Sequence, residues 1–147
     1  MKKHLLFPVL LLIISMSFSF NSFKSTKGKF QRDGYYFFLT ARQDIPNAKS
    51  KFYCSEVMYF KGYNDCNKNL DYQYYGIVKE KFMKYLADKY KVQSVTVSRE
   101  GGKKSDYGYI ETEEIGETRL NKFVSQQTDY GNGTVKTDFN YNCSDLK

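Results

Sequence analysis

The chain has 147 residues and a formal net charge of +7, with 14 tyrosines, 12 phenylalanines, no tryptophan and one histidine. That histidine, His4, falls in an expected export signal, so the mature chain has none. Ser-His-Asp and Cys-His catalysis and histidine-ligated metals are thereby excluded. We expect no cofactor, and an enzyme would have to use carboxylates, lysine, serine or tyrosine.

The beginning of the chain predicts export. A positively charged start is followed by an unbroken apolar run, Leu5–Ile14, and then by small residues, which is the pattern of a signal peptide. We assign residues 1–19 to this signal, with cleavage after Ser17 or Ser19. The apolar stretch is shorter than the about 20 residues that a membrane-spanning helix needs; an uncleaved anchor is the alternative interpretation. We expect a periplasmic or secreted protein with no transmembrane segment after cleavage.

Positive charge is concentrated near the start of the expected mature chain. Residues 20–33 are polar and basic and are interpreted as a flexible leader, and residues 34–147 as a single domain. Residues 52–147 carry equal numbers of acidic and basic side chains. A nucleic-acid-binding domain more often carries its charge on a folded face with interleaved aromatic residues, so we expect no nucleic-acid partner. Weak contact of the leader with an anionic surface is its functional interpretation.

The hydrophobic pattern predicts about four strands and two helices in the order ββαβαβ. Alternating or continuous apolar runs indicate strands, and apolar residues at three- and four-residue steps indicate helices. The expected strands are 34–41, 51–61, 92–98 and 135–141, and the expected helices are 75–90 and 109–127. Gly116 is expected to weaken the second helix. The fold class is α+β: a two-layer α/β sandwich with both helices on one face of the sheet.

Three cysteines in an exported protein allow one disulfide and leave one thiol over. Cys54 lies within an apolar strand pattern, which is typical of a small buried hydrophobic residue. We therefore predict a Cys66–Cys143 disulfide, which closes a long loop and ties down the end of the chain. A Cys54–Cys66 disulfide is the alternative. The cysteine spacing does not match a zinc site.

Oxygen-bearing side chains alternate in the loop after the second expected strand. They are Asp65, Asn67, Asn69 and Asp71. This spacing is similar to the start of a calcium loop, but Leu70 stands where such a loop needs glycine for its sharp turn. We interpret the segment as a polar loop with Asx turns and expect no metal site.

A glycine-lysine pair occurs after the third expected strand, within Gly101–Ser105. A phosphate-binding P-loop needs a further glycine where Val97 stands, and a single lysine between glycine and serine or threonine. Two lysines separate Gly102 from Ser105. The segment is therefore predicted to be a turn rather than a nucleotide site.

Four glutamates cluster near the start of the second expected helix: Glu111, Glu113, Glu114 and Glu117. A pair of carboxylates about 5–10 Å apart could hydrolyse a glycoside. Negative charge in the first turn of a helix is also the ordinary way to offset the helix dipole. We favour the second interpretation and assign no catalytic residue.

The second half of the chain has a recognisable pattern. Phe82–Tyr90 leads into a valine-rich strand and a charged helix with Arg119 and Phe123, and the chain closes with Val-x-Thr-Asp-Phe-x-Tyr at Val135–Tyr141. This resembles small exported bacterial proteins of unknown function over roughly residues 50–142. The resemblance implies export and an α/β fold, and that group has no assigned activity to transfer.

These observations favour a non-enzymatic exported domain that binds an unidentified protein or glycan partner at the cell envelope or outside the cell. A role as an inhibitor of a secreted partner is indistinguishable from this at the sequence level. The alternative is a small carboxylate-dependent glycan hydrolase, which requires converging carboxylates in a cleft lined by tyrosines. The position of the four glutamates discriminates between the two hypotheses.

Overall fold

The structure, a computed structural model, describes residues 34–63, 65–102 and 108–146. The expected signal peptide at 1–19 and the basic leader at 20–33 lie outside the described residues. Among the helices that are described, none is both long enough and apolar enough to cross a membrane.

The α+β class and the ββαβαβ order are confirmed, and the second expected strand is divided into two short ones. The elements are β1 (Tyr35–Gln43), β2 (Lys51–Cys54), β3 (Met58–Phe60), α2 (Asp71–Tyr90), β4 (Thr96–Glu100), α3 (Glu113–Asp129), β5 (Gly133–Lys136) and a 3-10 turn, η1 (Cys143–Asp145).

The sheet is built around β1. The β2 and β3 strands pair with successive halves of one edge of β1, and β4 pairs with β1 as well, all three antiparallel to it. The β5 strand adds to β2 in the parallel direction. The β2, β4 and β5 strands therefore run the same way, with β4 and β5 at the two ends of the sheet.

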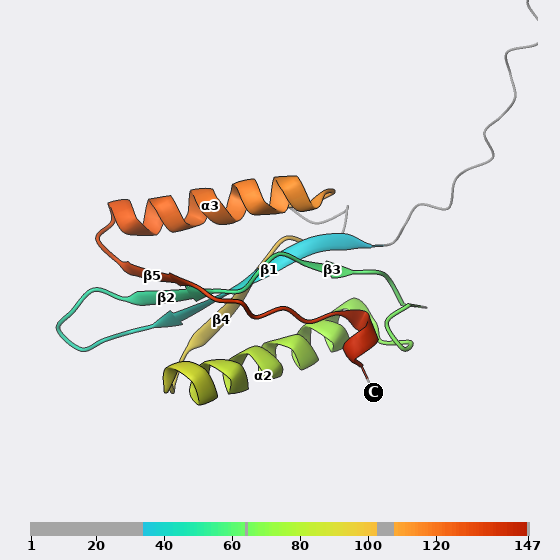
Figure 1. Ribbon diagram of the computed structural model, residues 1–147, viewed down its shortest axis with the longest axis horizontal. Coiled ribbons are helices and arrows are strands. Elements are labelled where there is room, and N and C mark those ends of the chain that lie inside the picture. Colours follow the sequence, from blue (N-terminus) through green and yellow to red (C-terminus); the bar gives the residue numbers. More distant parts are fainter. Residues whose placement is uncertain (1–33, 64, 103–107, 147) are drawn as a thin grey trace, which may run out of the picture. The chain divides into compact units, whose positions relative to one another are not determined.

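The two helices lie on opposite faces of the sheet, rather than together on one face as the sequence predicts (Figure 1). Alternate side chains of β1 divide between two core clusters. Phe37 and Leu39 pack with the buried side of α2, whereas Phe38 packs with Leu120 of α3. The domain thus has three layers, α2, sheet and α3.

The path of the chain explains this layering. The connection through α2 crosses β1 from β3 to β4, and the connection through α3 returns across β1 and β2 to β5. Connections between parallel strands are right-handed in nearly all proteins. Two connections of the same hand that travel in opposite directions must cover opposite faces. The sequence does not establish the strand order, and the faces that the two helices cover depend on that order.

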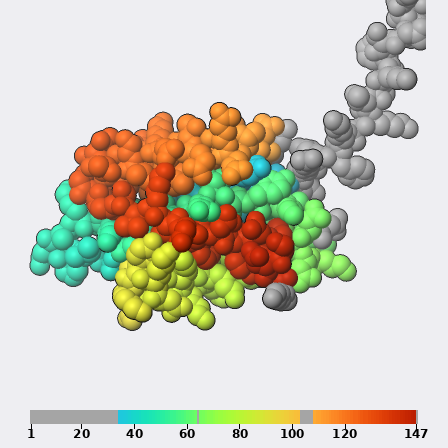
Figure 2. All heavy atoms as spheres, viewed as in Figure 1, coloured from blue at the N-terminus to red at the C-terminus, as the bar shows by residue number. Residues whose placement is uncertain are grey.

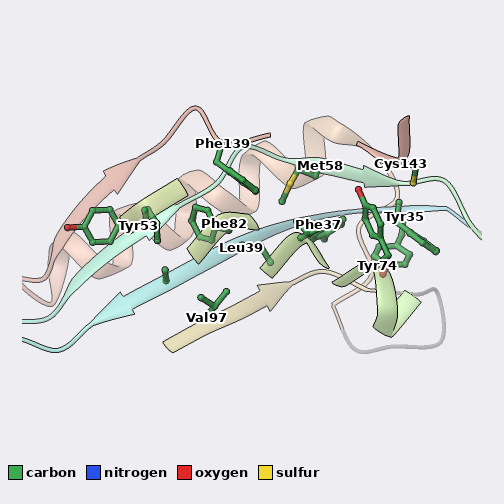
Figure 3. Packing of buried hydrophobic residues seen from close by; sticks show 14 of the residues in the cluster. Tyr35, Phe37, Leu39, Tyr53, Met58, Tyr74, Phe82, Val97, Phe139 and Cys143 are labelled. Atoms are coloured by element: carbon green, nitrogen blue, oxygen red, sulfur yellow. The ribbon is translucent and has the colours of Figure 1, made fainter. Parts of the chain in front are cut away.

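The larger core cluster lies between α2 and the sheet. Four α2 side chains at helical spacing, Tyr74, Val78, Phe82 and Leu86, are fully buried there. Phe82 and Phe139 have ring centroids 4.9 Å apart, and Figure 3 shows the two side chains side by side. Burial of side chains of this size contributes about 1.5–3 kcal/mol each, so this face supplies much of the stabilisation.

The smaller cluster lies between α3 and the sheet, and Gly116 permits its close packing. A Cβ atom on Gly116 would lie 2.6 Å from Cγ1 of Val57. Gly116 is buried in the first turns of α3, so the glycine expected to weaken the helix is the contact point that lets α3 approach the sheet.

Ser55 causes the division of the second expected strand. Its hydroxyl accepts from the amide of Leu39 (2.8 Å) and donates to the carbonyl of Glu56. Its own amide bonds to the carbonyl of Leu39 (2.9 Å). The Ser55 hydroxyl thus accepts the hydrogen bond that the Ser55 carbonyl would accept in a regular antiparallel ladder. Regular pairing resumes only at Met58.

The helices begin at residues different from those predicted. The α2 helix begins at Asp71, because the Gln73 side chain accepts from the amide of Leu70 (2.8 Å) and caps the first turn. The α3 helix begins at Glu113, because the hydroxyl of Thr112 caps the amide of Ile115 (3.3 Å).

The strand expected at 92–98 starts later, as β4, at Thr96. Lys91 and Ser94 both have left-handed backbone conformations, with φ of 56° and 59°. Two such residues close together produce a turn and prevent an extended strand from starting there. Val92 is nevertheless buried, so its apolar character reflects packing in a turn.

The strand expected at 135–141 ends at Lys136, and the rest of the segment is extended but irregular. Its residues are held individually. Thr137 bonds to the carbonyl of Cys54, the carbonyl of Phe139 accepts from Glu56 (3.0 Å), and the carbonyl of Tyr141 accepts from the Tyr74 hydroxyl (2.9 Å). Figure 2 shows this part of the chain on the surface between α3 and α2.

The Val-x-Thr-Asp-Phe-x-Tyr pattern therefore has a structural role along its length. Val135 packs against the larger core, and Phe139 is buried in it. Asp138 accepts from Lys89 at 2.7 Å and from the Tyr85 hydroxyl. The motif fastens the C-terminal segment to α2 and to the β2–β3 region.

Cys66 and Cys143, the pair favoured by the sequence, lie at disulfide distance with Cα atoms 4.5 Å apart. Cys54 is free and buried, as its place in an apolar strand pattern indicates. The bond joins the loop before α2 to the turn η1 and closes the C-terminal segment over the core.

Candidate functional site

A surface cavity of about 460 Å³ lies between the end of β4 and α3. A volume of this order is typical of sites that take small ligands or single groups of larger ones. Phe38 of β1 and Phe123 of α3 give the cavity apolar surface, and Glu100, Gly101 and Gly102 line it from the end of β4.

One face of α3 supplies most of the polar groups of the cavity. Arg119, Lys122, Phe123 and Gln126 all line it. Their spacing of three, four and seven residues from Arg119 brings them to the same side of a helix. The face therefore presents two cations, an aromatic ring and an amide.

These polar groups differ in how they are engaged. Arg119 donates one hydrogen bond to the carbonyl of Gly108, and a guanidinium has further donors. Within the described residues, the side chains of Lys122 and Gln126 form no hydrogen bond or ion pair. An ammonium and an amide with free donors beside an aromatic ring can bind a carboxylate or phosphate oxygen.

The end of β4 fixes the opposite side of the cavity. Glu100 pairs with Phe38 across the sheet, so both side chains lie on the α3 face. Gly101 has φ of +97°, and a Cβ atom there would lie 2.6 Å from the carbonyl oxygen of Tyr36. Only glycine allows the chain to turn against β1 at this point.

Among the described residues that line the cavity, cationic side chains outnumber acidic ones. Arg99 also lines it, but its guanidinium is bound elsewhere: it donates to Asp71 (2.7 Å) and to the Tyr35 hydroxyl (2.8 Å). This leaves Arg119 and Lys122 against Glu100.

The four glutamates that the alternative hydrolase hypothesis would use do not meet in this cavity. Glu111, Glu113 and Glu114 are exposed and Glu117 is partly exposed. None of the four is among the residues that line the cavity. Glu113 and Glu114 occupy the first turn of α3, where negative charge offsets the helix dipole.

The alternating oxygen-bearing residues of the disulfide loop have structural partners. The Asn69 amide donates to the carbonyls of Cys66 (3.0 Å) and Asn67 (3.3 Å). Asp71 forms the ion pair with Arg99. Among the described residues no group of three or more histidine, cysteine or acidic side chains is arranged to hold a metal.

The glycine-lysine segment is divided by the limits of the described chain. Gly101 and Gly102 line the cavity, whereas residues 103–105 of the motif lie outside the described residues. Lys122 and Gln126 were not singled out by the sequence. In the sequence, only the spacing of Arg119, Lys122 and Gln126 around Phe123 could have identified them. This spacing is informative only when the exposed side of the helix is known.

Cys54 is not a reactive group in this structure. Burial raises the pKa of its thiol to about 12, so the nucleophilic thiolate is suppressed at neutral pH. Burial likewise raises the pKa of the Tyr74 hydroxyl, which acts as a hydrogen-bond donor to Tyr141.

No family model, curated protein or solved structure matches the chain.

Proposed function

We propose that this chain is exported and works outside the cytoplasm as a non-enzymatic binding domain. Its ligand places an anionic group, joined to an apolar or planar part, in the cavity between β4 and α3. The signal pattern at residues 1–19 and the Cys66–Cys143 pair support export, since disulfides persist in oxidising compartments.

The observation that carries the proposal is the α3 face of the cavity. Lys122, Phe123 and Gln126 line the cavity together, and neither the Lys122 ammonium nor the Gln126 amide has a bonding partner in the described chain. Apolar surface with a few convergent polar groups is the usual composition of a ligand site. The exposed positions of Glu111, Glu113 and Glu114 give the hydrolase hypothesis no support.

The ligand site is tested by NMR titration of the exported, disulfide-containing protein. Benzoate and phenyl phosphate serve as anionic probes with a ring, and benzamide as the neutral probe of the same shape. We expect both anions to shift the amides of Gly101, Gly102, Lys122 and Gln126, and benzamide to bind about tenfold more weakly, because it lacks the charge-assisted hydrogen bond.

A matched pair of variants assigns the effect to one side chain. Lys122→Glu reverses the charge in the cavity. Lys84→Glu makes the same change on the exposed side of α2, where the Lys84 side chain has no hydrogen bond or ion pair to any described residue. Only Lys122→Glu should weaken binding of benzoate. Equal binding of benzoate and benzamide, or an equal loss in both variants, contradicts the proposed site.

Export is tested separately by the mass of the protein recovered from the periplasm or the medium. We expect a chain that begins at Phe18 or Phe20, after cleavage at Ser17 or Ser19. Recovery of the intact chain in the membrane fraction would instead support an uncleaved anchor.

A further inference from the structure

We propose that the partner in this cavity is the carboxyl-terminal end of an extended peptide, which adds to the sheet along the outer edge of β4. This inference rests on the proposed function, because the peptide's terminal carboxylate is the anionic group that enters the cavity.

The first observation is the free edge of β4. In the described chain, Thr96–Glu100 pairs with β1 alone, through the register Phe38↔Glu100 to Arg42↔Thr96. The opposite edge of a strand carries backbone N–H and C=O groups that a further strand can pair with. Peptides are bound in this way by many domains, with main-chain hydrogen bonds giving affinity and pockets giving specificity.

The second observation is a row of exposed polar side chains beside that edge. Thr96, Ser98 and Glu100 lie on the same face as Phe38, because they pair with even-numbered β1 residues, and all three are exposed. The α3 helix packs over β1 and β5 and leaves this part of β4 uncovered. An added strand would have room for alternate side chains between β4 and α3.

The third observation is where the cationic cavity lies. It stands at the carboxyl end of β4, where Gly101 and Gly102 turn the chain away and Lys122 and Gln126 face the opening. A peptide that runs parallel to β4 brings its terminal carboxylate to this point. Two glycines leave no side chain to obstruct the backbone of the peptide.

Glu100 favours a terminal carboxylate over an acidic side chain. An aspartate or glutamate on the α3 face of the added strand would lie across from Glu100, and like charges in that position are destabilising. A terminal carboxylate extends beyond Glu100 to Gly101 and reaches Lys122. The site therefore distinguishes the end of a chain from an internal acidic residue.

The test compares three peptides on the exported, disulfide-containing protein by NMR titration. The first is acetyl-Lys-Thr-Val-Ser-Thr-Val with a free carboxylate, the second is the same peptide as an amide, and the third is the amide with Asp in place of Ser. We expect amide shifts along Thr96–Gly102, and about tenfold tighter binding of the free acid than of either amide.

Two controls locate the interaction. Lys122→Glu should remove the preference for the free acid, and Lys84→Glu should preserve it. N-methylation of alternate peptide bonds, which removes donors from one edge of the peptide, should abolish binding in one of the two alternation registers only.

Each outcome is informative. Equal binding of the free acid and the amides, or shifts that avoid β4, would overturn the peptide inference. If benzoate still shifts the cavity amides while no peptide binds, the inference fails and the proposed function stands. If neither probe binds, both fail. Tighter binding of the Asp-containing amide than of the free acid would mean that the site prefers an acidic side chain to a chain terminus. This result would also overturn the inference.

Discussion

The carbonyl oxygen of Cys54 accepts two hydrogen bonds from Thr137, one from its amide (2.8 Å) and one from its hydroxyl (2.9 Å). Cys54 is the last residue of β2, and Thr137 directly follows β5. The bond from the Thr137 amide extends the parallel pairing by one residue. The pairing then ends, because the next donor of this segment, the Phe139 amide, bonds to the Thr137 hydroxyl (3.4 Å). The C-terminal segment leaves the sheet at this point.

Thr137→Val tests this junction. Valine keeps the shape of threonine but lacks the hydroxyl, so the bond donated to Cys54 and the bond accepted from the Phe139 amide (3.4 Å) are both lost. We expect a loss of about 1–2 kcal/mol in the free energy of unfolding. Thr118→Val on the exposed side of α3 is the matched control and should change stability by less than about 0.5 kcal/mol. Urea unfolding of both variants measures the difference. Equal stabilities would show that the hydroxyl bond contributes nothing.

Two helical glycines should respond to alanine in opposite directions. At Gly116 a Cβ atom would lie 2.6 Å from the stiff side chain of Val57, whereas at Gly76 of α2 no atom lies within 4 Å. We expect Gly116→Ala to destabilise the protein by about 1–3 kcal/mol through overpacking. Gly76→Ala should stabilise it by up to about 1 kcal/mol through helix propensity. Thermal unfolding of the two variants is the measurement, and stabilisation by both would disprove the close approach of α3.

Gly116 also shows where sequence reasoning stops. Hydrophobic patterns predict the regions of both helices and of the strands, because burial on α2 repeats at helical spacing and β1 is a nearly continuous buried apolar run. The element ends depended on single bonds, such as the Gln73 cap and the Ser55 hydroxyl. Those bonds, and the tight contact at Gly116, depend on which elements are neighbours.

The candidate site was less accessible to sequence than the fold. The sequence predicts a turn at Gly101 and Gly102 and a charged helix that contains Arg119 and Phe123. What joins them is the crossing of α3 over the opposite face from α2, which depends on strand order. The glutamates, by contrast, stand out as a cluster in the sequence but lie apart from the cavity in space.

The partly buried ion pair between Arg99 and Asp71 should matter more than a surface pair. Its side chains are 20% and 12% exposed, and Arg99 also stacks over the Tyr35 and Tyr75 rings. Removing one partner of a buried pair lowers the free energy of unfolding by about 3–5 kcal/mol. Because this pair is partly exposed, we expect Arg99→Met to lower it by about 3 kcal/mol or slightly less. Arg42→Met, which breaks the exposed pair with Asp44, should cost less than about 1 kcal/mol.

Urea unfolding of the two arginine variants gives the comparison. Arg99→Lys adds a test of geometry, since lysine keeps the charge but cannot stack and bond to both Asp71 and Tyr35 as a planar guanidinium does. We expect it to lie between wild type and Arg99→Met. An Arg99→Met variant as stable as Arg42→Met would mean that the pair is as solvated as a surface pair.

Thiol counting should separate the three cysteines. We expect no thiol to react with Ellman's reagent in the native protein, because Cys54 is buried and its pKa is raised to about 12. One thiol should react after denaturation, and all three after reduction and denaturation. Cys66→Ser/Cys143→Ser should lower stability by about 4 kcal/mol in the chain-entropy account of a long loop. Three reactive thiols in the denatured, unreduced protein would rule out the disulfide.

Acid should release the C-terminal segment from α2 through Asp138. Hydrogen bonds from Lys89 and Tyr85 lower the pKa of this carboxyl from 3.8 to about 2. A carboxyl whose pKa is lower in the folded than in the unfolded chain contributes stability above the unfolded value and loses it as the pH falls through the folded value. The contribution should therefore fade between about pH 4 and pH 2, and Asp138→Asn should lack this part of the acid transition.

Carbon-detected NMR titration of the Asp138 carboxyl in wild type and in Lys89→Met measures the cause directly. A pKa near 3.8 in both would show that the pair does not form in solution, whereas a rise only in Lys89→Met identifies Lys89 as the group that holds Asp138 ionised.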